Sequence, residues 1–335
     1  MGDSAPAISV VVPCLNASET LSFSIESILG QSCADLEVVW FDDGSTDDSA
    51  ALIESYARRD ARVRLIRSEH VGIVEALRRG CAAARGRFIA RMDADDVAHP
   101  ERLFEQVSYL ERNPGVGLCG TQVRTVGEGI GSGRRRYETW LNALLTHEDM
   151  TRDLFVECPI AHPTLMIRRE VFDAVGGYED RGWAEDYDLL MRCHAADIRM
   201  GKVARSLLDW RNGPGRLSLR DERYSLSKFR ALKRYYLRRT FLKEQATFFQ
   251  WGAGEVGKSW LAEWDEFRPE AVVDVNPRKI GKVIHGVPVI EAEDLPRPGE
   301  GFTVVAVGAP GAREDIRGWF EARGYAETRD FLFLA

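Results

Sequence analysis

Three aspartates, Asp93, Asp95 and Asp96, stand within four positions directly after the apolar run Phe88-Ile89-Ala90. Carboxylate oxygens are the ligands that hard divalent cations prefer, and Mg²⁺ usually combines one or two carboxylates with substrate phosphates. A strand that ends in this cluster is therefore expected to hold a metal-bound diphosphate. The alternative is a solvated acidic turn, which is the commoner explanation of an isolated D-x-D. The elements around the cluster decide between the two.

Strand and helix patterns alternate through the first hundred residues. Apolar runs predict strands at 8–12, 36–41, 63–66 and 88–90, and helical spacing predicts helices at 17–31 and 72–81, with another that Thr46 or Asp47 caps. Such repeats imply parallel strands with right-handed crossovers, and ligands then bind at the carboxyl ends of the strands. We therefore expect one sheet edge to gather the polar residues that follow these strands, namely Pro13, Asn16, Asp42, Asp43, Asp93 and Asp95.

The rest of the chain divides near residue 245, where a new strand-helix-strand series starts. Before it the patterns predict strands at 116–123 and 164–167, and helices over most of 134–153, at 171–175, at 184–196 and along 219–243. We expect a first domain at 1–218, a basic helical linker at 219–245 and a small α/β domain at 246–335.

Composition limits the class of protein. With 335 residues, 44% apolar and 29% charged, the chain reads as an ordinary globular protein of two domains. The net charge of -7 gives no overall case for nucleic-acid binding, and no apolar run approaches the roughly 20 residues of a membrane helix. The start lacks the pattern of a secretory signal. Six scattered cysteines without a C-x-x-C pair argue against disulfides and zinc, so we expect a cytoplasmic protein.

Five motifs occur in the order and spacing of a known family. They are Pro13-Cys14-Leu15-Asn16, Asp42-Asp43-Gly44-Ser45-Thr46-Asp47, Met92-Asp93-Ala94-Asp95-Asp96, Gly176-Gly177-Tyr178 and Ala184-Glu185-Asp186-Tyr187-Asp188-Leu189. From about residue 7 to 220 the chain resembles family 2 glycosyltransferases with the GT-A fold. The resemblance implies an α/β fold, a UDP-sugar donor, a Mg or Mn ion, and transfer with inversion at the anomeric carbon.

The resemblance also implies roles on the donor side. Asp43 resembles the carboxylate that accepts a hydrogen bond from the uracil ring, with helix capping as its alternative, and Pro13 and Asn16 shape the loop against the nucleotide. Asp95 resembles the metal ligand, and Asp93 reaches the ribose or the water shell of the metal. Asp96 has an alternative explanation as a helix cap before Pro100.

On the acceptor side, Asp186 resembles the catalytic base that takes the proton of the attacking hydroxyl. Glu185 and Asp186 also open a helix, where negative charge is favourable in any protein. We assign Glu185 and Trp183 to the acceptor, although Trp183 is nearly as well explained as a core aromatic. His162 stands where related enzymes often carry a polar residue near the donor sugar, and packing explains it equally well.

Two positions depart from the family pattern. Arg78 replaces the usual asparagine, and it either reaches the diphosphate or is simply exposed. Gly213 stands where many members place a histidine, which puts a further metal or diphosphate contact in doubt, and Arg211 is the residue able to compensate. The Q-x-x-R-W signature of polymerising synthases is absent, so we expect transfer of a single sugar.

A second glycine motif follows the boundary. Gly252, Gly254 and Gly257 form G-x-G-x-x-G after an apolar run, and Asp274 follows about twenty residues later. The segment resembles small Rossmann-like domains appended to sugar-modifying enzymes. These four residues either form a second ligand site or belong to a docking domain whose glycines serve packing, and we favour the docking domain.

The hypotheses differ in the molecule that accepts the sugar. A surface polysaccharide or glycolipid intermediate is the commonest acceptor in this family. The overall layout also resembles a eukaryotic group described as β-1,3-N-acetylglucosaminyltransferase-like and linked to galactosylation of queuosine in tRNA. In that alternative the basic run Lys228–Lys243 meets tRNA phosphates, although such runs are usually solvated helix faces. A hypothesis of another class is a non-catalytic nucleotide-sugar-binding or scaffold protein.

Overall fold

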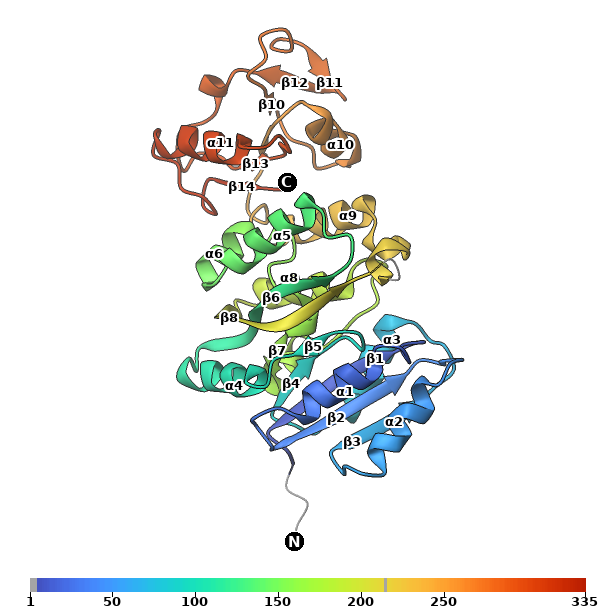
Figure 1. The fold of residues 1–335 in the computed structure, drawn as a ribbon. Helices are drawn as coiled ribbons and strands as arrows, with labels where there is room; N and C mark the ends of the chain where they lie inside the picture. Colours follow the sequence, from blue (N-terminus) through green and yellow to red (C-terminus); the bar gives the residue numbers. More distant parts are fainter. Residues whose placement is uncertain (1–4, 214–215) are drawn as a thin grey trace. The chain divides into compact units, whose positions relative to one another are not determined.

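The computed structural model describes residues 5–213 and 216–335, which form two compact units (Figure 1). The first unit comprises the chain up to Met150 and Pro159–Ser225, and the second comprises Thr151–Cys158 and Leu226–Ala335. The segment 219–245, expected to link two domains, is divided, because its helix α9 (Leu226–Leu237) is grouped with the second unit. In the described parts of the chain, the helices are all too short or too polar to cross a membrane.

The first unit is built on an eight-stranded mixed sheet. Its strands are β1 (Ile8–Cys14), β2 (Leu36–Asp42), β3 (Val63–Arg67), β4 (Phe88–Arg91), β5 (Val97–Ala98), β6 (Val116–Gly127), β7 (Met166–Arg168) and β8 (Arg199–Asn212). They lie in the order β3-β2-β1-β4-β7-β6-β8-β5. The first four strands pair in parallel, as the strand-helix repeats predicted. β7 is antiparallel to β4 and β6, and β5 is antiparallel to β8.

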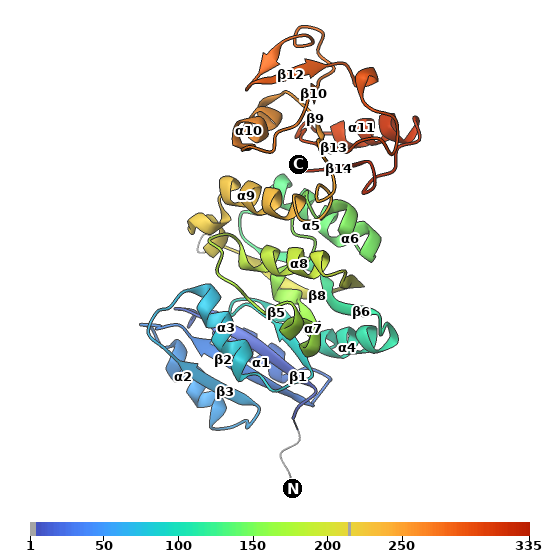
Figure 2. The same cartoon turned by 180° about the vertical axis from the view of Figure 1, so that it is seen from behind.

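Helices pack on both faces of the parallel strands (Figures 1 and 2). On one face, Val10, Val12 and Trp40 share a buried cluster with Ile25 of α1. Val11, which lies between the two valines, instead contacts α3, because a Cβ added to Gly80 would come within 2.7 Å of the Val11 side chain. Because successive strand residues point to opposite faces, α1 and α3 must cover different faces. The helices are α1 (Leu21–Leu29), α2 (Ser49–Ala57), α3 (Ile73–Ala83), α4 (Arg102–Arg112), α5 (Ser132–Ala143), α6 (His147–Asp153), α7 (Arg169–Ala174) and α8 (Glu185–Ala195), with the 3-10 turn η1 (His162–Thr164).

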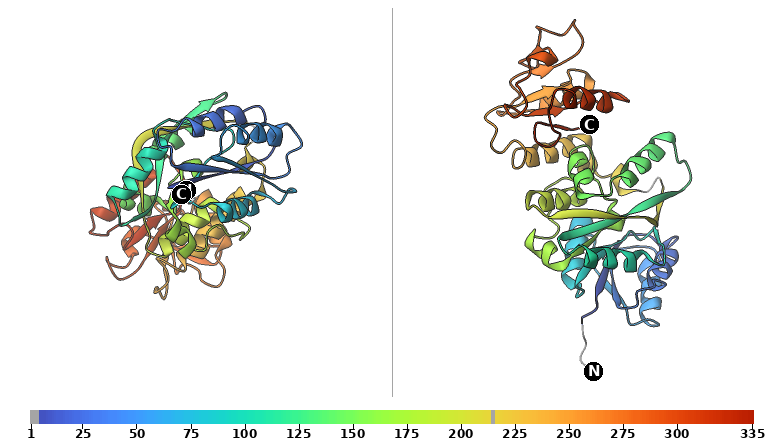
Figure 3. Two further views of the ribbon diagram at one scale, coloured as in Figure 1. Left: turned by 90° about the horizontal axis from the view of Figure 1, so that it is seen from below. Right: turned by 90° about the vertical axis from the view of Figure 1, so that its left-hand side faces the viewer.

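Two segments differ from the sequence-based expectation. The strand β8 was not expected, and it pairs with β6 from Arg199 to Asn212 (Figure 3). The long helix predicted at 219–243 is wrong in its first part, where two short 3-10 turns, η2 (Leu217–Leu219) and η3 (Glu222–Tyr224), precede α9. The Asp221 side chain accepts a hydrogen bond from the Arg223 amide, a local contact that competes with helix formation.

The second unit contains a six-stranded sheet in the order β11-β12-β10-β9-β13-β14. Its elements are β9 (Phe249–Trp251), α10 (Glu255–Glu263), β10 (Val272–Val273), β11 (Val283–Ile284), β12 (Val287–Ile290), η4 (Ala292–Asp294), β13 (Thr303–Val305), α11 (Ala312–Glu321) and β14 (Phe331–Phe333). All neighbouring strands are parallel except β11 and β12. From β12 to β14 the order follows that of a doubly wound sheet, in which the chain reverses direction beside its first strand.

Candidate active site

The parallel strands of the first unit end at one edge of the sheet. In the register, Cys14 at the end of β1 lies beside Asp42 at the end of β2, and Arg91 at the end of β4 lies beside Val11. The loops that follow these strands therefore meet at that edge, as the sequence predicted. They carry Asn16, Asp43 and the acidic cluster Asp93, Asp95 and Asp96.

The acidic cluster brings its three carboxylates together. One oxygen from each of Asp93, Asp95 and Asp96 lies within 4.8 Å of the others. Asp93 forms an ion pair of 2.5 Å with the buried Arg91. Asp96 is 1% exposed, and its Oδ2 has no hydrogen-bond partner. A buried carboxylate oxygen without a donor is costly unless a ligand meets it, so the cluster has the chemistry of a site for a hard divalent cation.

The electrostatics of the cluster support this interpretation. Burial and the neighbouring Asp93 raise the pKa of Asp95 to about 6. Burial, together with Asp93 and Asp95, also raises the pKa of Asp96. Like charges held together out of water disfavour ionisation, and a bound cation would reverse that effect.

Strand β8 holds the acidic loop in place. The Arg211 amide donates to Asp96 Oδ1 at 2.7 Å, and Arg211 Nε donates to the Asp95 carbonyl at 2.9 Å. The interpretation of Asp96 as a helix cap is wrong, because α4 begins only at Arg102 and the carboxylate of Asp96 binds β8 instead. Arg211, predicted as a phosphate contact, thus also supports the loop that carries Asp95.

The loops around Asp43 are fastened by side chains. The buried Asp43 carboxylate accepts hydrogen bonds from the Val71 amide at 2.7 Å and the Gly72 amide at 3.0 Å, and it lies 2.9 Å from His70 Nδ1. Asp42 Oδ1 accepts from the Ser45 amide at 3.2 Å. Asp43 therefore organises the loop before α3, and its predicted contact with a nucleobase stays a prediction.

Asn16 connects the first loop to the second. Its backbone is left-handed (φ 51°), a conformation that asparagine tolerates better than most residues. Its Oδ1 accepts a hydrogen bond from the Thr46 amide at 2.8 Å, and its own amide donates to Ser45 Oγ at 2.9 Å. Pro13 stands near the end of β1, just before this loop. These contacts give the loop expected to face the nucleotide one defined conformation.

Arg78 lies on α3. Its guanidinium pairs with Glu75 at 2.9 Å, and 58% of its side chain is exposed. Of the two alternatives left open by the sequence, the structure shows the exposed arginine.

Asp186 stands in the first turn of α8 and is half-buried. Its Oδ1 accepts a hydrogen bond from the Tyr187 amide at 2.7 Å. The preceding Trp183 donates from Nε1 to the buried Asp188 at 2.8 Å, and Asp188 also accepts from Arg192 Nε at 2.8 Å. The orientation of Trp183 beside Asp186 is thus determined by a buried ion pair.

Glu185 belongs to the interior. It is 2% exposed, and its two oxygens accept from the Tyr224 hydroxyl at 2.8 and 3.0 Å. Burial raises the pKa of Glu185, despite the hydrogen bond from Tyr224. The role at the acceptor expected for Glu185 therefore has almost no exposed surface to support it, and the contact instead ties η3 to the start of α8.

His162 packs beside Glu185. Its Nε2 lies 2.6 Å from the Tyr178 hydroxyl, and its Nδ1 lies 3.8 Å from Glu185 Oε1. Burial and the charge of Arg91 lower the pKa of His162 well below its usual range, so the ring is neutral. Of its two alternatives, packing in the interior is the one that the contacts show.

Sequence reasoning missed an aromatic and two arginines near the acidic loop. The Arg134 guanidinium lies 3.9 Å from the ring centre of Trp210, and that of Arg216 lies 5.3 Å from the same ring. The only signal in the sequence was the arginine run 134–136, and nothing in it indicated that β8 would bring Trp210 to it.

Comparison with known proteins identifies the family. Residues 9–176 match the family described as Glycosyl transferase family 2. The chain belongs to this family. An uncharacterized glycosyltransferase of Haemophilus influenzae is 32% identical over 192 residues, which cover 55% of this chain and 59% of that relative. The chain thus spans less than two thirds of the length of this curated relative.

Two solved structures resemble this family 2 chain in fold. Staphylococcus aureus TarS 1-349 in complex with UDP-GlcNAc superposes with a TM-score of 0.53 at 17% identity, covering 76% of this chain and 78% of TarS. The Pyrobaculum calidifontis mannosyltransferase PcManGT in complex with GDP-Man and Mn²⁺ superposes with a TM-score of 0.50 at 19% identity, covering 72% of this chain and 64% of PcManGT. The expected α/β fold of GT-A type is confirmed.

The glycine motif of the second unit is used for packing in this family 2 chain. Gly252 has a φ of 111°, and a Cβ on Gly257 would lie 1.8 Å from the Gly252 carbonyl oxygen, so neither position accepts a side chain. Gln250 Nε2 donates to the carbonyls of both glycines at 3.0 Å. Around Gly254 there is open space instead.

Asp274 is satisfied by its own unit. It lies 2.8 Å from Lys279 Nζ and accepts hydrogen bonds from the amides of Ala253 and Asn276. Although burial acts in the opposite direction, the hydrogen bonds from Lys279 and these amides lower the pKa of Asp274. The carboxylate of the possible second ligand site is thus already paired.

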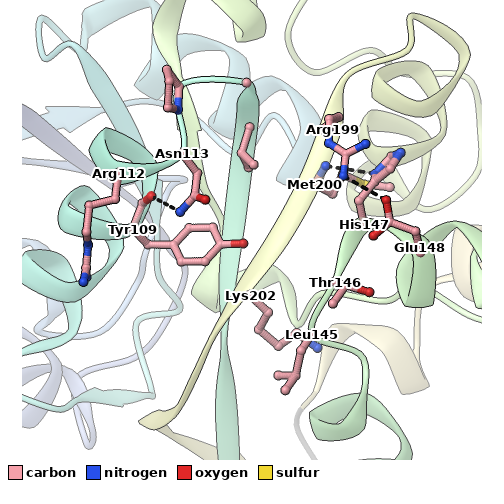
Figure 4. Close-up of a pocket in the computed structure, with 13 residues that line it drawn as sticks. Tyr109, Arg112, Asn113, Leu145, Thr146, His147, Glu148, Arg199, Met200 and Lys202 are labelled. Carbon is pink, nitrogen blue, oxygen red and sulfur yellow. Dashed lines mark hydrogen bonds and ion pairs between the residues drawn. The ribbon is translucent and has the colours of Figure 1, made fainter.

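A separate cavity of about 600 Å³ lies at the other ends of β6 and β8, where Val116 and Arg199 begin these strands (Figure 4). Its charged side chains are engaged. Arg199 pairs with Glu148 at 2.8 Å, and Lys202 Nζ donates to the carbonyls of Leu141 and Pro159. The cavity lies where β8 begins, whereas the acidic cluster contacts Arg211 near the end of the same strand.

Proposed function

We propose that the protein is a metal-dependent inverting glycosyltransferase that moves one sugar from a UDP-sugar to an acceptor hydroxyl. The observation that carries the proposal is the cluster of three carboxylates, with one buried oxygen that has no hydrogen-bond partner, at the carboxyl ends of the parallel strands. Such an edge is the ligand site of α/β folds.

A divalent cation, Mg or Mn, fits this cluster. Asp95 would be its ligand with Asp93 in support, and Asp96 adds the third carboxylate of the cluster, with a buried Oδ2 that has no hydrogen-bond partner. When bound, the ion offsets the charge that develops on the departing diphosphate. Asp93 is held for this role by Arg91, and Asp95 by the hydrogen bond of Arg211 to its carbonyl.

The nucleotide would lie across the first two loops. Each carboxylate oxygen accepts about two hydrogen bonds, so Asp43 Oδ1 keeps capacity for the uracil N–H beyond its bond to the Val71 amide, while Oδ2 meets the Gly72 amide and His70. Asn16 supports this site through its bond to Thr46. The half-buried Asp186 then acts as general base, because an inverting transfer needs one carboxylate to take the proton of the attacking hydroxyl.

For the acceptor we propose the hydroxyl of a glycan or glycolipid. The basic run that favoured tRNA has a structural use inside the second unit. Arg230 and Arg234 both pair with Glu263, and Arg238 pairs with Asp265. Lys233 is buried and donates to the carbonyls of Val156 and Leu334. We further propose that this unit is a Rossmann-like docking domain, in keeping with its satisfied Asp274.

The test is Asp186→Asn in the full chain, assayed with Mn²⁺ and a panel of UDP-sugars. Transfer or slow hydrolysis of the donor should fall by about 10²–10⁴-fold, the usual contribution of general base catalysis, while UDP affinity stays within about twofold. Asp197→Asn is the matched control, because Asp197 is exposed just after the same helix and its left-handed backbone (φ 57°) suits asparagine.

Unchanged turnover in Asp186→Asn would remove Asp186 from the role of base. Tight binding of UDP-sugars by the wild type without any hydrolysis or transfer would instead indicate a nucleotide-sugar-binding or scaffold protein.

A further inference from the structure

Two guanidinium groups meet one indole beside the acidic cluster. Arg134, in the first turns of α5, lies 3.9 Å from the ring centre of Trp210, and Arg216 lies 5.3 Å from it. Both distances are within the range of cation–π attraction. Trp210 belongs to β8 and also packs against Tyr137, at 6.4 Å between ring centres, and the Arg134 guanidinium lies 5.5 Å from the Tyr137 ring centre. The indole is therefore a fixed platform for two cations.

The position of Arg134 is determined by β6. Its Nε donates to Thr125 Oγ1 at 3.2 Å, and Thr125 lies opposite Trp210 in the pairing of β6 with β8. Its Nη2 is buried and has no hydrogen-bond partner. A buried charged donor left without an acceptor costs more than a neutral one, so this orientation is unfavourable unless an anion completes it.

The two cations also disfavour each other. Burial, and then the charge of Arg216, lower the pKa of Arg134, while Asp96 of the acidic cluster raises it. A structure that places like charges on one ring gains stability when an anion binds between or beside them. Arginine is the side chain best suited to a phosphate, because its planar fork donates two parallel hydrogen bonds.

The acidic cluster lies next to this platform. Arg211, the residue after Trp210, donates its amide to Asp96 at 2.7 Å, and Asp209, the residue before it, pairs with Val97 of β5. A diphosphate held by a cation at Asp95 would be within electrostatic range of Arg134, since the charge of Asp96 already acts on that guanidinium. We propose that Arg134 and Arg216, supported by Trp210, bind the diphosphate of the nucleotide-sugar donor. The inference rests on the proposed function.

The experiment is calorimetric titration of the full chain with UDP and with uridine, in the presence of Mn²⁺. Arg134→Gln and Arg216→Gln should each raise the Kd for UDP by about tenfold or more, as expected for loss of a charge-assisted hydrogen bond, and leave the Kd for uridine within about threefold. Arg134→Lys should lose less affinity for UDP, because lysine keeps the positive charge although it lacks the planar guanidinium. Arg136→Gln is the control, because it removes one positive charge from an exposed position of the same helix, α5.

The outcomes separate the two proposals. If the variants bind UDP as the wild type does, or if Arg136→Gln weakens binding equally, the arginine site is overturned while the proposed transfer stands. Equal weakening of UDP and uridine indicates damage to the fold rather than a phosphate contact, and also overturns it. If the wild type binds no UDP with Mn²⁺, the proposed function fails as well.

Discussion

The two sheets of this protein end in aspartates that have opposite surroundings. After β4 of the first sheet, three carboxylates share a small space, and one oxygen of Asp96 is buried without a partner. After β10 of the second sheet, Asp274 is paired with Lys279 and accepts from two amides. Both sites lie at the carboxyl ends of parallel strands, where α/β proteins bind ligands.

The difference shows that topology alone does not make a ligand site. At the second edge, Lys279 supplies the positive charge that Asp274 needs. The glycines of the motif serve packing, because Gly257 lies close to the carbonyl of Gly252. At the first edge, burial and the neighbouring Asp93 outweigh the positive charges of Arg91 and Arg211, and the pKa of Asp95 rises to about 6. We therefore expect a ligand at the sheet edge whose carboxylates remain electrostatically unsatisfied.

Among the variants that test this comparison between the two sheet edges, Asp95→Asn should have the largest effect. Removing the proposed metal ligand should lower turnover by about 100-fold or more and abolish the rise in Tm that Mn²⁺ and UDP together produce. Activity assays and thermal unfolding with and without the metal measure both. A variant that keeps a full metal-dependent shift would show that the cation binds elsewhere.

Asp274→Asn should affect stability and leave catalysis unchanged. Asparagine cannot pair with Lys279 as a carboxylate does, and we expect a loss of about 1–3 kcal/mol in the stability of the second unit. Denaturant unfolding measures this loss, and turnover per folded molecule should equal that of the wild type. Reduced turnover in fully folded protein would mean that the second edge is a ligand site after all.

Metal binding should weaken in acid. Since the pKa of Asp95 is raised to about 6, protons compete with the cation below that pH, by up to about tenfold in affinity per pH unit. The stability of the metal-free protein should change in the opposite direction. A carboxyl group whose pKa is raised in the folded state stabilises that state as the pH falls from about 6 towards about 4, the pKa in the unfolded chain. The stabilisation by Mn²⁺ should therefore be clearly larger at pH 7.5 than at pH 5.5. An equal shift at both values would exclude Asp95 as the ligand.

The smallest effect is expected for Arg78→Gln. Arg78 is mostly exposed and pairs with Glu75 on its own helix, a type of contact that contributes little. UDP affinity should change by less than about twofold, measured beside Arg134→Gln in the same titration. A tenfold loss at Arg78 would show that it, rather than the pair on Trp210, meets the diphosphate.

Much of the first sheet edge was predictable from the sequence. The apolar runs that become β1, β2 and β4 end directly before Asn16, Asp43 and Asp93, and strand-helix alternation implies that such ends share an edge. Both signals are local, because side-chain alternation and turn residues act within a few positions of each other. The glycine motif of the second unit likewise stands directly after β9, where Gly252 has a φ of 111°.

The tertiary structure decided what surrounds those residues. Strand β8 brings Arg211 to Asp96 and Trp210 to Arg134, and η3 brings Tyr224 to Glu185, across separations of 115, 76 and 39 residues in the chain. Whether an aspartate meets an amide, a lysine or another aspartate depends on which distant strands pair, and that choice reflects the packing of the whole core. The sequence therefore determined which side chains stand at the strand ends, whereas only the folded chain determined which of them are left unsatisfied for a ligand.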